Sequence, residues 1–145
     1  MIVVDANVVL SALRSSRGAS HQLLRRMLAG GVPFAVSTAV ALEYEDVLKR
    51  PGILGDQPWI HGGEIDTVLD AVFSQAHLVS PRFRFRPFLA DPKDDIYMEC
   101  ALTAVAKFIV SNDRHFLHPA VKAFGISVVG AGEFIAEQTR RSLPR

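Results

Sequence analysis

Acidic residues that follow two apolar runs are the strongest chemical signal in this sequence. The run Ile2–Val4 ends at Asp5, and the run Phe108–Val110 is followed by Asp113 after two intervening residues. Short, continuously apolar runs are typical of buried strands in a parallel sheet. Because the carboxyl ends of parallel strands lie at the same edge of a sheet, we expect the two carboxylates to meet there.

Three further acids fall in helices that are predicted to begin near that edge. Glu43 lies one to two turns into the helix after the second predicted strand. Asp95 lies in the first turn of a helix that opens with Asp-Pro at 91–92, a typical N-cap followed by proline. Glu99 comes four residues later and therefore shares a helix face with Asp95. This face is acidic at its start and apolar as far as Ala106, as expected for a helix that lies against the sheet.

Acids gathered in this way favour a bound cation. Two like charges about 4 Å apart repel by several kcal/mol at a surface-like dielectric, so some must be protonated or a cation must lie among them. Carboxylate oxygens suit Mg²⁺ or Mn²⁺. A zinc cluster is not indicated, because Cys100 is the single cysteine and the five histidines are scattered. A carboxylate-bound Mg²⁺ or Mn²⁺ can activate water against a phosphodiester, which is the chemistry of metal-dependent nucleases.

Each acid also has an ordinary structural interpretation. Asp5 and Asp113 could each cap the turn that follows, and Glu43 belongs to a charged stretch typical of a solvated helix face. Asp94 suits the first helical turn through the helix dipole. Glu99 is the exception, because an acid in an otherwise apolar stretch needs a partner. The metal hypothesis therefore rests on the conjunction of these acids.

Strands and helices alternate along the chain. Strands are predicted at 2–4, 34–36, 77–80, 108–110 and 126–129. Helices are predicted at 7–13, 20–29, 37–50, 64–76, 91–106 and 132–140, with Ser37 as an N-cap and a loop at 51–63. The alternation favours an α/β fold with a parallel sheet and helices on both faces. The length predicts a single domain over residues 1–145.

Composition excludes several classes of protein. The chain has 145 residues, 49% of them hydrophobic, and a net charge of +1, which argues against disorder. A single cysteine cannot form an internal disulfide and indicates a reducing, cytoplasmic setting. No apolar run approaches the ~20 residues of a membrane span, and no basic region precedes the first apolar run as it would in a signal peptide. The charge balance neither demands nor excludes a polyanionic partner.

The acidic blocks together resemble the PIN domain, the small ribonuclease fold of many VapC-type toxins. The start, Ile-Val-Val-Asp-Ala-Asn at 2–7, is similar to the opening motif of that family. Glu43 with Val-Leu-x-Arg-Pro at 47–51 resembles the second block. The sequence Asp-Pro-x-Asp-Asp-x-Tyr-Met-Glu-Cys-Ala at 91–101 resembles the third block in the branch of predicted toxin components, and Ile-Val-Ser-Asn-Asp at 109–113 resembles the fourth. The four blocks occur in the expected order over nearly the whole chain.

The resemblance implies a three-layer αβα sandwich with a central, mainly parallel sheet. It also implies one or two Mg²⁺ or Mn²⁺ ions and cleavage of single-stranded RNA by metal-activated water. Asp5, Glu43, Asp95 and Asp113 match the acidic positions that hold the metal, and Glu99 matches an extra acid of this branch. Asp94 also fits the third block, and Asp95 is preferred because it shares a face with Glu99.

Two polar residues and two partners follow from the same resemblance. Asn7 and Ser111 match the positions that orient the metal-binding acids. The resemblance further implies a homodimer and a groove for the helical tail of an antitoxin, a helix-in-groove mode of binding.

A basic and aromatic stretch precedes the third acidic block. Arg82, Arg84 and Arg86 alternate with two phenylalanines, so an extended chain would place all three arginines on one face. They could contact an RNA backbone, or they could be the wet face of an ordinary extended segment. His115, close to Asp113, could contact phosphate.

Two other functions remain open on the sequence. A haloacid-dehalogenase-like phosphatase also places an aspartate after its first strand, but it needs a second carboxylate where Asn7 stands, together with a well-placed lysine. A catalytically inactive PIN-like module would only bind RNA or protein. The retained acids argue against it, because an inactive site has no physical reason to keep like charges together.

Overall fold

The computed structural model describes residues 1–55, 60, 62–82, 92–112, 121–122 and 124–142. It contains the strands β1 (Ile2–Val4), β2 (Ala35–Ser37), β3 (His77–Val79), β4 (Phe108–Val110) and β5 (Ser127–Val129). Its helices are α1 (Ala6–Arg14), α2 (Ala19–Leu28), α3 (Thr38–Leu48), α4 (Gly62–Gln75), α5 (Pro92–Thr103) and α7 (Ala131–Ser142). Every strand and helix predicted above is present; the ends of β1 and β4 are as predicted, and no other end differs by more than three residues.

All the strand pairs are parallel, and the direction in which the chain adds new strands to the sheet reverses at β1. Strand β1 pairs with β4, β4 pairs with β5, and β2 pairs with β3. A single parallel bridge between Ile2 and Phe34 joins the two groups, which sets the order β3-β2-β1-β4-β5. The chain first builds outward from β1 through β2 to β3 and then crosses to β4. The switch point therefore lies at β1 and β4, where ligands of open α/β sheets bind beyond the carboxyl ends.

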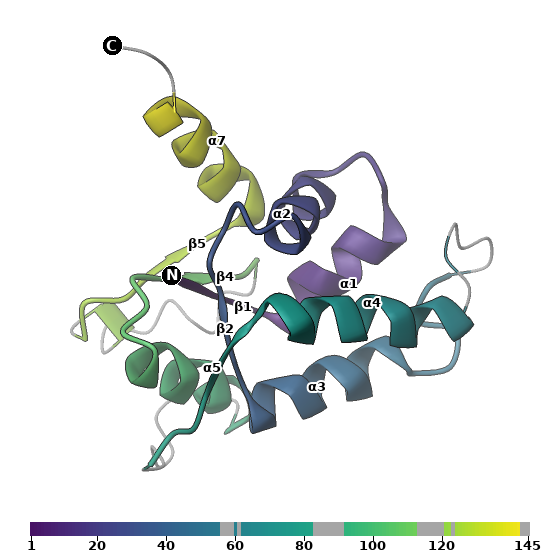
Figure 1. Ribbon diagram of the computed structural model, residues 1–145, viewed down its shortest axis with the longest axis horizontal. Helices are drawn as coiled ribbons and strands as arrows, with labels where there is room; N and C mark the ends of the chain where they lie inside the picture. The colour runs from purple at the N-terminus through teal and green to yellow at the C-terminus, as the bar shows by residue number, and fades with distance from the viewer. Residues whose placement is uncertain (56–59, 61, 83–91, 113–120, 123, 143–145) are drawn as a thin grey trace.

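Helices cover both faces of this sheet (Figure 1). The helices α1 to α4 connect β1, β2 and β3, and right-handed crossovers in one direction place them on one face. The connection from β3 to β4 runs the opposite way, so α5 lies on the other face and packs against β1, β2 and β4. Helix α7 returns to the first face and packs on α2. The predicted three-layer αβα sandwich with a mainly parallel sheet is confirmed.

The core lies between these layers. All three residues of β1 are buried, as are Ile109 and Val110 of β4. Helix α2 buries Leu23, Leu24 and Met27 at helical spacing. Each such side chain contributes roughly 1.5–3 kcal/mol through burial. Strands β1 and β2 are buried along their whole length and β4 over its last two residues, and β1 and β4 position the residues that follow them.

Two helix ends illustrate how local sequence shapes the elements. The Ser37 hydroxyl accepts a 3.2 Å hydrogen bond from the Val40 N–H, which confirms Ser37 as the N-cap of α3. Helix α5 ends at Thr103, before Ala106, so the expectation that Ala106 continues the Asp95–Glu99 face is wrong. The Ala106 N–H binds the carbonyl of Ala101, and Val105 between them has φ +55°. This left-handed residue reverses the chain and ends the helix.

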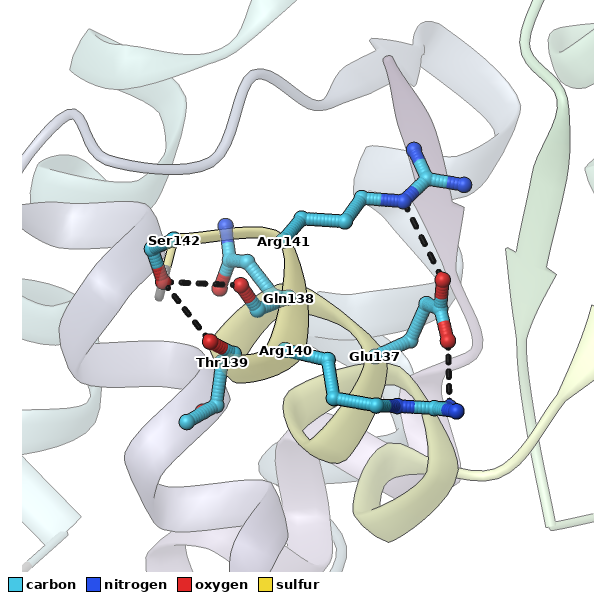
Figure 2. Close-up of polar contacts among 6 residues, drawn as sticks. All are labelled: Glu137, Gln138, Thr139, Arg140, Arg141 and Ser142. Carbon is cyan, nitrogen blue, oxygen red and sulfur yellow. Dashed lines mark hydrogen bonds and ion pairs between the residues drawn. The ribbon is translucent and has the colours of Figure 1, made fainter. Parts of the chain in front are cut away.

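Helix α7 is attached by packing and by two hydrogen bonds of the Gln138 side chain, one of them a 3.4 Å bond from its amide to the Gly31 carbonyl. The rings of Phe134 and Phe108 meet edge to face, with centroids 6.1 Å apart. Arg26 of α2 donates a 2.6 Å hydrogen bond to the side chain of Gln138. Further along α7, Glu137 accepts hydrogen bonds from Arg140 and Arg141 (Figure 2). These last pairs lie at the surface and join residues of α7 to each other, so they do not attach α7 to the rest of the protein.

Candidate active site

Asp5 lies at the switch point of the sheet and is buried there. It follows β1, is only 4% exposed, and caps α1. Its Oδ1 accepts a 3.2 Å hydrogen bond from the Asn7 N–H, and its Oδ2 accepts a 2.6 Å hydrogen bond from the Ser111 hydroxyl. Because Ser111 follows β4, this second bond joins the carboxyl ends of two neighbouring strands. The Asp5 carboxylate is therefore fixed in direction and lies at the positive end of the α1 dipole.

The first amide groups of α1 all have acceptors. Four N–H groups at a helix start have no partner within the helix. That of Asp5 binds the Val110 carbonyl, that of Val8 binds the Asp5 carbonyl, and that of Asn7 binds the Asp5 carboxylate. The remaining one, the N–H of Ala6, donates a 3.1 Å hydrogen bond to the hydroxyl of Tyr97. Tyr97 on α5 thus completes the N-terminus of α1 from the opposite face of the sheet.

A second tyrosine binds the backbone before Asp5. The Tyr44 hydroxyl on α3 donates a hydrogen bond to the Val4 carbonyl. Burial raises the pKa of Tyr44 well above its usual value, and the neighbouring Tyr97, Cys100 and Asp5 raise it further. Tyr44 therefore remains a neutral hydroxyl and a hydrogen-bond donor at physiological pH.

The single cysteine lies in the same buried region but is unsuited to nucleophilic chemistry. Burial raises the pKa of the Cys100 thiol to about 11, although hydrogen bonds with Ser37 act in the opposite direction. A thiol with such a pKa is protonated at neutral pH, and the thiolate is the reactive form. Cys100 is also fully buried.

Those of the remaining predicted ligands that the structure describes lie on α3 and α5. Asp95, two residues before Tyr97 on α5, is 5% exposed. Glu43, beside Tyr44 on α3, and Glu99 on α5 are partly exposed. Helix α5 contacts both β1 and α3. Asp113 and the Asp94 side chain lie outside the described part of the chain.

The donor chemistry suits a hard cation, although the described residues do not complete a site. Asp5 and Asp95 provide carboxylate oxygens, which Mg²⁺ and Mn²⁺ prefer, and Asp5 is already oriented. Within residues that the structure describes, no three acidic, histidine or cysteine side chains come close enough to hold an ion. A full ligand set would therefore need a residue from outside them, and Asp113 lies three residues after the end of β4 in the sequence.

The structure describes only some of the residues that were predicted to orient the metal ligands or to contact RNA. Ser111 contacts Asp5 through its hydroxyl, whereas Asn7 contacts it through the backbone N–H and is exposed. Arg82 is exposed. The other predicted RNA contacts, Arg84, Arg86 and His115, lie outside the described residues.

Sequence reasoning missed Tyr44 and Tyr97. They are the only two tyrosines in the chain, and each lies within two residues of a predicted ligand. A hydroxyl in a buried helix face needs a polar partner, so their position beside Glu43 and Asp95 was the available signal.

Comparison with known proteins assigns the fold to a family. The family model for the PIN domain matches residues 1–115. The chain belongs to the PIN-domain family. The match includes every acidic position named above and ends before β5 and α7. PIN domains are generally nucleases that use divalent metal ions, bind RNA and often pair with antitoxins.

The other comparisons add no relative of this PIN domain. Neither the curated proteins nor the solved structures gave a match. Among the described helices of this PIN domain, none is long and apolar enough to cross a membrane.

Proposed function

We propose that this PIN domain is a metal-dependent endoribonuclease that cleaves single-stranded RNA. The observation that carries the proposal is the buried, oriented Asp5 carboxylate at the switch point, in a chain whose family consists generally of nucleases. Family membership also favours this function over the haloacid-dehalogenase-like phosphatase. In that phosphatase a second carboxylate would stand at position 7, where this chain has an exposed asparagine.

The proposed ligands are carboxylates on separate elements. Asp5, Glu43, Asp95 and Asp113 would hold Mg²⁺ or Mn²⁺, with Glu99 assisting. When bound, the ion would activate water and neutralise charge on the phosphodiester. Asp5 contributes an oxygen donor whose direction Ser111 and the Asn7 N–H determine. Arg82, Arg84, Arg86 and His115 are proposed to contact RNA phosphates.

A cleavage assay with a matched pair of variants tests the proposal. Asp5→Asn removes the proposed ligand, and Asp70→Asn makes the same charge change on the exposed face of α4. We expect wild type and Asp70→Asn to cleave single-stranded RNA with Mg²⁺ or Mn²⁺ and to stop when chelator is added. Asp5→Asn should lose the activity while remaining folded by circular dichroism.

Two results would contradict the proposal in different ways. Metal-dependent hydrolysis of a small phosphate ester without RNA cleavage would support the phosphatase. Tight RNA binding without turnover by wild type would support an inactive PIN-like module.

We further propose that the chain is a cytoplasmic toxin restrained by an antitoxin, and that it forms a homodimer. The support is the similarity of its acidic blocks to the toxin branch of the family. A short open reading frame directly upstream is expected, and its product should co-purify with this chain and suppress RNA cleavage. A chain that lacks such a neighbour and is harmless on expression would contradict the toxin role.

A further inference from the structure

Tyr44 and Tyr97 bind the backbone on the two sides of Asp5. Tyr44 binds the carbonyl of the residue before it, and Tyr97 binds the N–H of the residue after it. Both side chains are buried, with exposures of 0% and 2%. Ser111 and the Asn7 N–H bind the carboxylate itself. Asp5 is therefore held at its side chain and at both flanking peptide groups.

Each tyrosine forms a hydrogen bond with a backbone group that has no partner in the strand pairing or within the helix. Alternate residues of a strand direct their N–H and C=O groups to opposite neighbours. The Ile2 N–H binds Pro33 on the β2 side, so the Val4 carbonyl faces that side as well. Pairing between β1 and β2 is limited to the bridge at Ile2, so Tyr44 supplies the donor for Val4. Likewise, the Ala6 N–H has no acceptor within α1, and Tyr97 supplies one.

The two hydroxyls approach from opposite layers of the sandwich. Tyr44 belongs to α3 and Tyr97 to α5, and these helices contact each other. Each helix also carries a proposed ligand close by, Glu43 beside Tyr44 and Asp95 two residues before Tyr97. The same side chains therefore tie both ligand-bearing helices to the end of β1.

We propose that Tyr44 and Tyr97 are positioning residues that fix the peptide groups around Asp5 and thereby set the direction of its carboxylate. The inference rests on the proposed function in that Asp5 is a metal ligand. Partners outside the ligand shell typically change metal affinity or activity by about 10–100-fold when removed. A misplacement of about 1 Å at a reacting centre has a comparable effect.

The variants Tyr44→Phe and Tyr97→Phe remove one oxygen each and keep the packed ring. We expect each to bind Mn²⁺ about 10–100-fold more weakly by isothermal titration calorimetry. The Mn²⁺ concentration for half-maximal cleavage of single-stranded RNA should rise by the same factor. The control is Val72→Ala, which removes fully buried atoms from α4 and should leave Mn²⁺ affinity unchanged.

A second measurement is independent of metal and RNA. Amide hydrogen exchange in metal-free protein reports directly on the N-terminus of α1. We expect the Ala6 amide to exchange at least 10-fold faster in Tyr97→Phe than in Val72→Ala, after correction for global stability. The Asp5 amide, which binds the Val110 carbonyl, should lose protection in Tyr44→Phe.

The outcomes separate this inference from the ribonuclease proposal. Phe variants with wild-type exchange at Asp5 and Ala6 would overturn the positioning role. So would wild-type Mn²⁺ affinity in both variants of a protein that binds Mn²⁺. If wild type binds no Mn²⁺ and cleaves no RNA while exchange still accelerates, the tyrosines position Asp5 but the ribonuclease proposal fails. The variants act on opposite flanks, so if one fails to fold, the other still tests the positioning role of its own tyrosine.

Discussion

The hydroxyl of Ser111 donates a 2.6 Å hydrogen bond to Oδ2 of Asp5 across 106 residues of sequence. Both residues are buried, and they follow β1 and β4, the two strands at the switch point of the sheet. A hydrogen bond to a charged acceptor is stronger than one between neutral groups. This contact therefore fixes the proposed ligand and also ties the two central strands together.

Replacement of Ser111 by alanine should lower both stability and activity. The change leaves a buried carboxylate oxygen without its hydroxyl donor, which costs roughly 1–3 kcal/mol. Urea unfolding of metal-free protein measures this loss. Ser74→Ala removes an exposed hydroxyl from α4 and should change the unfolding free energy by less than about 0.5 kcal/mol. Equal unfolding midpoints for the two variants would show that the Asp5–Ser111 bond is energetically unimportant.

Stability should fall at alkaline pH because of Cys100. Burial raises the pKa of its thiol from 9.0 to about 11, so the folded protein holds this proton more tightly than the unfolded chain. Its stabilising contribution is complete below about pH 8 and is lost as the pH rises from 9 through 11. The full difference is equivalent to about 3 kcal/mol.

Two measurements check this pH dependence. Between pH 9 and 10 the unfolding free energy of wild type should fall more steeply than that of Cys100→Ala. A thiol reagent should label Cys100 at pH 8 only on unfolding. Rapid labelling of the folded protein would contradict the burial of this thiol.

Glycine at position 105 should stabilise the protein. Val105 has φ +55°, a conformation that costs a β-branched residue about 1–2 kcal/mol, and its side chain is 84% exposed. Little packing is therefore lost in Val105→Gly, and we expect a gain of about 1 kcal/mol in thermal or urea unfolding. Ala104→Gly, one residue earlier and without a positive φ, should be neutral or destabilising. A destabilised Val105→Gly would show that the valine side chain makes a contribution that outweighs its backbone strain.

Helix α7 should depend on its aromatic contact more than on its ion pairs. Glu137 binds two arginines that are more than 70% exposed, and such surface pairs contribute less than about 1 kcal/mol. Glu137→Gln should therefore change the unfolding free energy only slightly, and less still in 1 M salt. Phe134→Ala removes the ring that meets Phe108 and should cost about 2 kcal/mol or more. The reverse order of effects would contradict this account of α7.

Local pattern was sufficient for most of the fold. Apolar runs at β1 and β4, the Ser37 cap and the helical spacing in α2 depend on neighbours a few residues away, so the sequence expresses them directly. The rule that parallel strands end at one edge predicted that Asp5 meets Asp113, which lies outside the described residues, and at that edge the structure shows Asp5 bound to Ser111. Ligand assignments for Glu43, Asp95, Glu99 and Asp113 remain predictions.

The contacts that hold Asp5 depended on the folded chain. Tyr44 lies 40 residues from Val4, and Tyr97 lies 91 residues from Ala6. Their partners are backbone groups, which every residue possesses, so the sequence shows that both tyrosines lie near predicted ligands but does not show which groups they bind. The Val4 carbonyl became available only because β2 leaves β1 after a single bridge, and that divergence is a property of the packed layers.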